Sequence, residues 1–273
     1  MMRVAFQGER GAYSEEAAVT LLDRSEVIPC ASLRQVFESV AAGEAEAGVV
    51  PVENSQAGSI NETYDLLLTH TLYITGELNL RIRHCLLALP GQSVEDLRRV
   101  YSHPQALAQT EEFVRARGLE PFAMYDTAGS AKIVAEQRLR GVGAIAGRQA
   151  ARIYGLEILA EGIETNPNNY TRFLSLSRTP APRTAASKTS IVFTTQNIPG
   201  ALHRALGAFA ARSLNLTKLE SRPRREVPWE YVFYVDFEGH QEDPDAGAAL
   251  LDLRSVCTFV RVLGSYPRAA GHA

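Results

Sequence analysis

One short segment, NNYTRF, pairs a threonine with an arginine inside an apolar run that is typical of a β-strand. An arginine there can hold a carboxylate through two parallel hydrogen bonds, while the neighbouring threonine faces the other side of the pleat. A structural ion pair for Arg172 and ordinary β-propensity for Thr171 explain the same spacing. Spacing alone therefore leaves both interpretations open.

A second polar segment follows the apolar run at 47–52 and leads into a helical pattern. It carries Glu53, Asn54 and Ser55, followed by a tight turn at Gly58. Ligands in open α/β sheets bind at such strand ends, where loop amides can face an anion. Capping of the next helix is the alternative, but three hydrogen-bonding side chains and a turn exceed what one cap needs.

Two further segments have the same placement. SHPQALAQ puts Ser102, His103 and Gln105 between a strand and a helix, and Gln109 lies one helical turn beyond Gln105, on the same face. The first interpretation of His103 is a capping or surface role. In GERGAYS, Ser14 is expected to cap a helix, with substrate contact second. This loop lacks the third glycine of a dinucleotide fingerprint, which argues against a nicotinamide site.

The elements that position these segments alternate between strand and helix. The first series is βαβαβ over residues 3–52, and strand–helix pairs recur over 100–154. We expect parallel sheets covered on both faces. The β-rich stretch 71–89 between the two series suits a crossover, which predicts two α/β lobes with a cleft between them.

Beyond a linker at 179–188, rich in Pro, Ala, Thr and Ser, the pattern changes to βαββαβ, the ferredoxin-like order. Strands are predicted at 189–195, 214–221, 229–237 and 258–264, and helices at 199–213 and about 245–255. Pro199 is expected near the first position of its helix.

Composition excludes several classes of function. The net charge of −3 comes from interspersed acids and bases, so neither nucleic acid nor a membrane surface is an expected partner. The first residues leave no room for a signal peptide's apolar core, and no apolar run approaches 18 residues. The three cysteines are far apart and lack metal-ligand spacing, which favours reduced thiols in a cytoplasmic protein.

Taken together, the motifs resemble those of one enzyme family. GERGAYS, VPVENSQAGSINETYDLL, SHPQALAQ and NNYTRF occur in the order found in prephenate dehydratases and the similar arogenate dehydratases. GALHRAL and LESRP resemble the phenylalanine-binding motifs of the ACT regulatory domain. The resemblance implies a two-lobed, periplasmic-binding-protein-like α/β catalytic domain at 1–178 and an α+β ACT domain at 189–270. Lobe one would cover about 1–75 and 165–178, and lobe two about 76–164.

The resemblance also implies a reaction, the conversion of prephenate to phenylpyruvate with loss of water and carbon dioxide in L-phenylalanine biosynthesis. Thr171 would donate to the departing hydroxyl, fed by Glu53 or His103, and Arg172 would hold a substrate carboxylate. Asn54, Ser55 and the amides after Gly58 would receive the other carboxylate. The remaining substrate-site residues are Ser14, Ser102, Gln105, Asn169 and Phe173. For Asn169, a hydrogen bond across the cleft and a role in a turn are equally supported. Phe173 would pack against the Thr-Arg pair.

For the ACT domain the resemblance implies L-phenylalanine as effector, a homodimer or homotetramer, and no metal or organic cofactor. The implied effector site consists of Gly200, Ala201, Leu202, His203, Glu220, Ser221, Arg222 and Pro223. An exposed helix position is the alternative for His203. The alternative functions are arogenate dehydratase and a sensing module without catalysis.

Overall fold

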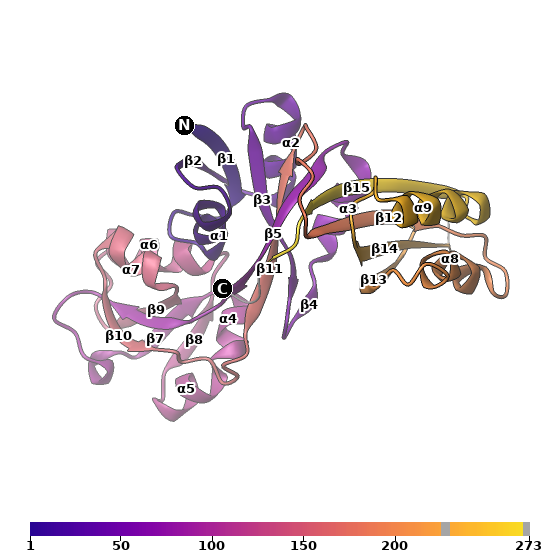
Figure 1. The fold of residues 1–273 in the computed structure, drawn as a ribbon. Helices are drawn as coiled ribbons and strands as arrows, with labels where there is room; N and C mark the ends of the chain where they lie inside the picture. The colour runs from indigo at the N-terminus through magenta and orange to yellow at the C-terminus, as the bar shows by residue number, and fades with distance from the viewer. Residues whose placement is uncertain (225–229, 270–273) are drawn as a thin grey trace. The chain divides into compact units, whose positions relative to one another are not determined.

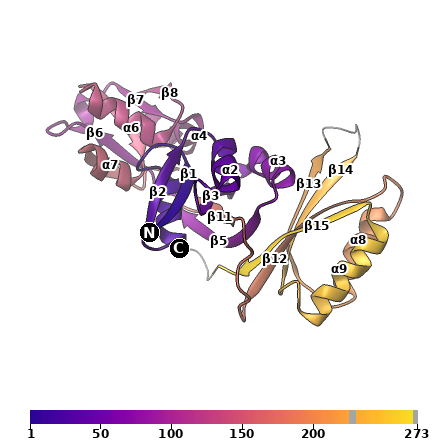
Figure 2. The same ribbon diagram turned by 90° about the horizontal axis from the view of Figure 1, so that it is seen from above.

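The computed structural model describes residues 1–224 and 230–269. Contacts divide the chain into two compact units. One consists of residues 1–66 and 78–175, and the other of residues 67–77 with the described residues after 175. Figures 1 and 2 show the chain from two directions.

The first sheet has the strand order β2-β1-β3-β11-β5, with β4 beside β3. β1 pairs in parallel with both β2 and β3, as the βαβαβ pattern predicts. Its strands are β1 (Met2–Gln7), β2 (Ser25–Cys30), β3 (Ala47–Asn54), β4 (Gly58–Ser59), β5 (Tyr73–Arg81) and β11 (Tyr170–Ser177). The accompanying helices are α1 (Tyr13–Leu21), α2 (Leu33–Ala42) and α3 (Asn61–Thr69).

The start of α1 differs from the expectation. The helix begins at Tyr13 after the N-cap Ala12, so Ser14 lies inside it and is no cap. The Glu15 carboxylate accepts hydrogen bonds from the Gly11 amide and from Arg10 Nε, at 2.6 Å in the latter case. A carboxylate in the first turn thus binds the amide of the residue that precedes the N-cap.

The second sheet has the order β10-β6-β9-β7-β8 and is mixed. β7 is parallel to β8 and β9, whereas β6 is antiparallel to β9 and β10, so the prediction of wholly parallel sheets is wrong here. β6 follows β5 without a helix, and no βαβ connection forces a parallel neighbour. The strands are β6 (Cys85–Ala88), β7 (Arg99–Ser102), β8 (Glu120–Ala123), β9 (Val142–Ala146) and β10 (Glu157–Glu161).

The helices around this sheet are short. They are η1 (Val94–Asp96), α4 (Pro104–Gln109), α5 (Glu111–Ala116), α6 (Thr127–Glu136) and α7 (Arg148–Tyr154). The helical pattern over 105–118 predicts one helix where α4 and α5 stand. It breaks at Thr110, which is buried and whose Oγ1 donates to the Ala106 carbonyl at 2.8 Å. Such bonds back to the preceding turn bend helices.

The stretch at 71–89 is a crossover, as predicted, because β5 belongs to the first sheet and β6 to the second. A single apolar cluster contains side chains of both sheets, among them Val4, Phe6, Ala144 and Phe173. The two lobes therefore share a core beside the crossover strands.

The C-terminal residues fold as βαββαβ, which confirms the ferredoxin-like prediction. The sheet order is β13-β14-β12-β15, and helices α8 and α9 lie on one face of it (Figures 1 and 2). The elements are β12 (Ser187–Thr194), α8 (Ala201–Ala210), β13 (Leu216–Pro223), β14 (Tyr231–Glu238), α9 (Pro244–Val256) and β15 (Phe259–Pro267).

One detail of this domain differs from the prediction, and two predicted positions cannot be compared with the structure. Pro199 precedes the helix, because Gly200 is the N-cap with a left-handed backbone (φ 78°). Trp229, predicted to open the third strand, and Ala270, the predicted domain end, lie outside the described residues.

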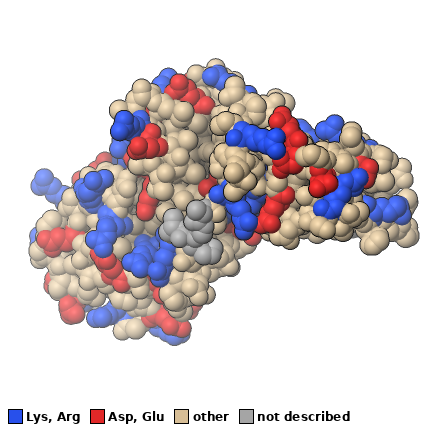
Figure 3. Space-filling view, viewed as in Figure 1, with Lys and Arg blue, Asp and Glu red and all other residues tan. Residues whose placement is uncertain are grey.

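Acidic and basic side chains are interspersed over the face seen in Figure 3. Among residues 1–224 and 230–269, no helix has the length and apolar character needed to cross a membrane.

Candidate functional site

The ends of β3 and β11, neighbours in the first sheet, bring three predicted residues together. The two hydrogens of Asn54 Nδ2 are shared among three acceptors, Asn169 Oδ1 at 2.9 Å, the Tyr170 carbonyl at 3.1 Å and Thr171 Oγ1 at 3.0 Å. Asn54, Asn169 and Thr171 are 6%, 0% and 8% exposed. Because buried polar groups are costly unless they are bonded, this cluster is a rigid arrangement.

Backbone amides determine the orientation of the Asn54 side chain. Its Oδ1 accepts from Gln56 N at 3.1 Å and Ala57 N at 3.0 Å, and an amide nitrogen of the backbone can only donate. Nδ2 must therefore face Thr171. Since Thr171 Oγ1 accepts from Asn54, the hydroxyl keeps its own proton as a donor.

Helix α4 of the second lobe contributes both predicted glutamines. Gln105 Nε2 and Gln109 Nε2 each lie 3.4 Å from Asn54 Oδ1. Asn169 Nδ2 donates to Gln109 Oε1 at 3.0 Å, a bond across the two lobes. The cluster thus connects the end of the first sheet with a helix of the second lobe.

The carboxylate-binding prediction for Asn54 and Ser55 does not fit this geometry. The donors of Asn54 are used on protein acceptors, and Ser55 Oγ donates to the Asn168 carbonyl at 3.0 Å while accepting from Tyr170 N at 3.0 Å. Both side chains are placed to hold the start of β11 against the end of β3.

The other predicted residues of this segment lie close by. Glu53 pairs with Ser59 and Asn54 with Gly58 in the β3–β4 hairpin, where Gly58 has a positive φ of 80°. Arg172 follows Thr171 along β11 and is half-buried, and neighbouring strand residues point to opposite faces.

Four predicted residues have other local roles. Ser102 is fully buried and donates to the Ile145 carbonyl at 2.6 Å, and His103 caps α4 by accepting from Gln105 N at 3.2 Å. Ser14 is buried within α1, and Phe173 is buried in the core that the two sheets share.

The loop at 8–14 ties the first lobe to the second. Glu9 Oε2 lies 3.0 Å from Lys132 Nζ, and Tyr154 OH donates to the Arg10 carbonyl at 2.8 Å. A Cβ on Gly11 would stand 2.8 Å from the Cα of Ala150, and φ is +87° there, so this position needs glycine.

Sequence reasoning missed His84, which lies in the crossover after β5. It is 2% exposed, and its Nε2 lies 2.9 Å from Gln109 Oε1. Burial lowers its pKa, although the bond to Gln109 and the charge of Glu164 oppose the shift. A lone histidine before the apolar run CLLAL offered only a weak signal.

In the C-terminal domain, Ala201 and Leu202 line a cavity of about 140 Å³ at the start of α8. Tyr231 and Phe233 of β14 also line it, and these residues pair with Pro223 and Ser221 of β13. The sheet register therefore brings the ESRP segment next to the wall that GALH helps to form. His203 is exposed on α8.

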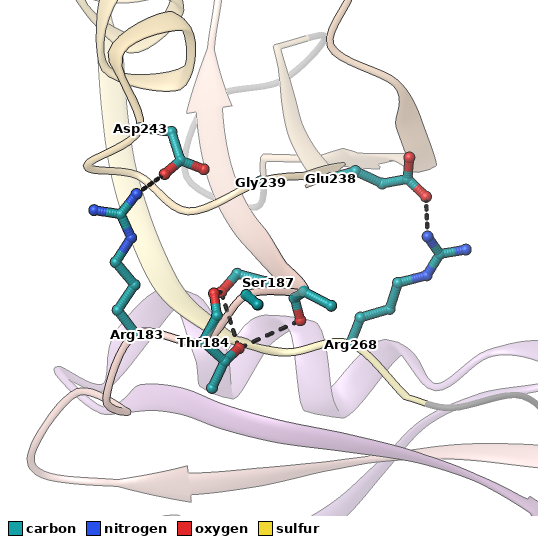
Figure 4. A pocket seen from close by; sticks show the side chains of 9 residues that line it. Arg183, Thr184, Ser187, Glu238, Gly239, Asp243 and Arg268 are labelled. Atoms are coloured by element: carbon teal, nitrogen blue, oxygen red, sulfur yellow. Dashed lines mark hydrogen bonds and ion pairs between the residues drawn. The ribbon is translucent and has the colours of Figure 1, made fainter.

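Two larger cavities contain none of the predicted catalytic or substrate residues. One, of about 560 Å³, has ion pairs Arg183–Asp243 and Arg268–Glu238 in its wall (Figure 4). The other, of about 470 Å³, is lined by Tyr13, three arginines and three glutamates, among other residues. Within the described part of the chain, no three His, Cys, Asp or Glu side chains are grouped to hold a metal ion.

Comparison with known proteins finds two family models along the chain. Residues 4–181 match "Prephenate dehydratase" and residues 189–255 match "ACT domain".

Similar proteins agree with these matches. "Arogenate dehydratase/prephenate dehydratase 2, chloroplastic" of Arabidopsis thaliana is 50% identical over 97% of this chain and 73% of its own length. A prephenate dehydratase structure from Arthrobacter aurescens in complex with L-Phe is 35% identical, covers 98% of this chain and 90% of its own, and has a TM-score of 0.90. A structure described as "GqqA- a novel type of quorum quenching acylases" is 37% identical, covers 98% of both chains and has a TM-score of 0.91.

Proposed function

The chain belongs to the prephenate dehydratase family and is a dehydratase, a lyase, with a C-terminal ACT domain, and on this premise we propose that prephenate is its preferred substrate. The product would be phenylpyruvate, formed with loss of water and carbon dioxide. The observation that carries the site assignment is the Thr171 hydroxyl, held as an acceptor by Asn54 with its proton left to donate.

In the proposed mechanism, Thr171 donates to the hydroxyl that leaves the ring. Aromatisation drives the reaction, so the protein has to place one donor at the leaving oxygen and hold the carboxylates. Glu53 or His103 supplies the proton that Thr171 passes on. His103 Nδ1 accepts from Gln105 N, so Nε2 is the nitrogen for this transfer.

The test is turnover by the purified chain, with prephenate and arogenate offered separately. A higher kcat/KM for prephenate supports the proposal, and a higher value for arogenate replaces it with the arogenate dehydratase alternative. Because the GqqA structure is similarly close, an acylase assay is run in parallel. Acylase activity without either dehydratase activity would contradict the proposal.

Arg172 is proposed to bind a substrate carboxylate with its planar guanidinium. Arg172→Lys keeps the charge but loses the two parallel bonds, so KM should rise about 10–100-fold, while kcat changes less. Steady-state kinetics measure the split. Arg178→Lys, the same change at an exposed arginine nearby, is the control, and an unchanged KM in Arg172→Lys would remove Arg172 from substrate binding.

We place the L-phenylalanine site at the cavity beside Ala201 and Leu202, which the complex of the Arthrobacter relative with L-Phe supports. Leu202→Ala removes apolar wall and should raise the dissociation constant of L-phenylalanine about 5–30-fold. Calorimetric titration measures it, with Leu251→Ala, an exposed leucine on α9, as the control. Equal affinity in all three proteins would put the site elsewhere.

Three further assignments are part of the proposal. The domain limits are 1–178, 179–188 and 189–270, supported by the family matches at 4–181 and 189–255. A homodimer or homotetramer is supported by apolar side chains exposed on the ACT domain, Leu219 and Phe259, and light scattering would test it. A cytoplasmic location is supported by the three free cysteines.

A further inference from the structure

A chain of buried and half-buried polar side chains leads away from Thr171 and includes a histidine to which no role has yet been given. It runs from Asn54 through Gln109 to His84, and then to Tyr13, whose hydroxyl lies 3.1 Å from His84 Nδ1. The members come from β3, α4, the crossover and α1. Residues far apart in sequence therefore meet in one hydrogen-bonded network.

The direction of each hydrogen bond follows from the backbone amides that bind Asn54 Oδ1. Since Asn54 Nδ2 faces Asn169 Oδ1, the other end of the Asn169 amide, Nδ2, donates to Gln109 Oε1. Gln109 Oε1 has no hydrogen, so His84 Nε2, 2.9 Å away, must carry one and donate it. The network allows the Nε2–H tautomer and excludes a neutral imidazole protonated at Nδ1.

Burial favours a neutral ring for His84, because it lowers the pKa of the imidazole. The Tyr13 hydroxyl donates its single proton to the Arg83 carbonyl at 2.7 Å, and its oxygen lies 3.1 Å from His84 Nδ1. Burial raises the pKa of Tyr13 well above its usual value, which keeps this hydroxyl protonated. The His84 backbone amide donates to Glu164 Oε2 at 3.0 Å, which fixes the residue in the crossover.

We propose that His84 is a positioning residue for the reaction: its Nε2–H holds the Gln109 amide so that Gln109 donates to Asn54, and Asn54 in turn holds the Thr171 hydroxyl in its donating orientation. This role rests on the proposed function of Thr171. A reversed Gln109 amide would place its NH₂ group against two donors, Asn169 Nδ2 and His84 Nε2, so both residues favour the same orientation of Gln109.

The kinetic test replaces the donor and then restores it. His84→Leu should lower kcat about 10–100-fold, because small misplacements of a reacting group have effects of this size, with KM changed by no more than about twofold. His84→Gln, whose side-chain amide can donate to Gln109, should recover most of kcat. His70→Leu removes a histidine outside the network and serves as the control.

The second readout does not depend on activity. In nitrogen-15 NMR of the imidazole, His84 should show a protonated Nε2 and an unprotonated Nδ1, with the signals assigned by their loss in His84→Gln. An unprotonated Nε2, or an unchanged kcat in His84→Leu, would overturn the inference. A wild-type protein without dehydratase activity would refute the proposed function instead, and the NMR result would still decide the tautomer.

Discussion

Thr171→Ala is expected to lower kcat about 10²–10⁴-fold, the range that a positioned proton donor contributes. KM should stay within about twofold, because the methyl and hydroxyl of Thr171 contribute little to holding the carboxylates of the substrate. Thr171 is 8% exposed and its hydroxyl is bound by Asn54, so loss of the hydroxyl leaves one hydrogen bond of Asn54 unmade but the strand intact.

The matched variant is Thr171→Ser, which keeps the hydroxyl and should retain most of kcat. Steady-state kinetics with prephenate compare the three proteins, and thermal unfolding shows whether each is folded. Normal turnover by Thr171→Ala would remove this hydroxyl from the mechanism, and equal losses in both variants would show that shape, rather than the donor, matters.

Asn54→Asp is the second substitution with a large expected effect, because it replaces the donating NH₂ group of a buried amide with an accepting oxygen of similar size. One carboxylate oxygen can still accept from Gln56 N and Ala57 N. The other would face Asn169 Oδ1 and the Tyr170 carbonyl, which are acceptors, and would draw the Thr171 proton to itself. Turnover and stability should therefore both fall.

We expect a kcat loss of about 10²-fold or more from misplacing the donor. Two buried acceptors lose their donor, so the free energy of unfolding should drop by about 3 kcal/mol. Denaturant unfolding and kinetics measure the two effects. Asn168→Asp makes the same change on an exposed neighbour and should alter neither. A stable, active Asn54→Asp protein would contradict the orientation assigned to Asn54.

Local signals predicted much of the fold correctly. The spacing of Ser32 and Gln35 predicts a helix cap, and the Ser32 side chain does accept from Gln35 N at 3.2 Å. The βαββαβ order of the C-terminal domain is confirmed as well. Cap chemistry and strand periodicity depend on residues within one turn or one strand, so a sequence displays them directly.

The expectations that failed depend on partners distant in sequence or on competition between neighbours. The first turn of α1 begins at Tyr13, so Ser14 lies inside the helix and not at its cap, and Thr110 breaks a helix whose pattern was continuous. β6 is antiparallel to its neighbours because of the direction in which the crossover enters the second sheet, and the sequence pattern does not indicate that direction.

For the candidate site, too, the sequence predicted some features correctly and gave no signal for others. The motifs gathered Asn54, Gln105, Asn169 and Thr171 into one prediction, and the structure brings these four together. What the motifs could not indicate is which atom of each amide faces which partner. That orientation changes Asn54 from a proposed substrate ligand to the residue that holds Thr171, and it adds His84.

The most direct test of the account is formation of phenylpyruvate from prephenate by the purified protein at neutral pH, where spontaneous breakdown of the substrate is slow. Wild type and Thr171→Ala are compared with a control without enzyme. We predict rapid formation by wild type, slowed by added L-phenylalanine, and formation near the control rate by Thr171→Ala. Equal rates in the two proteins, or no product from wild type, would contradict the central claim.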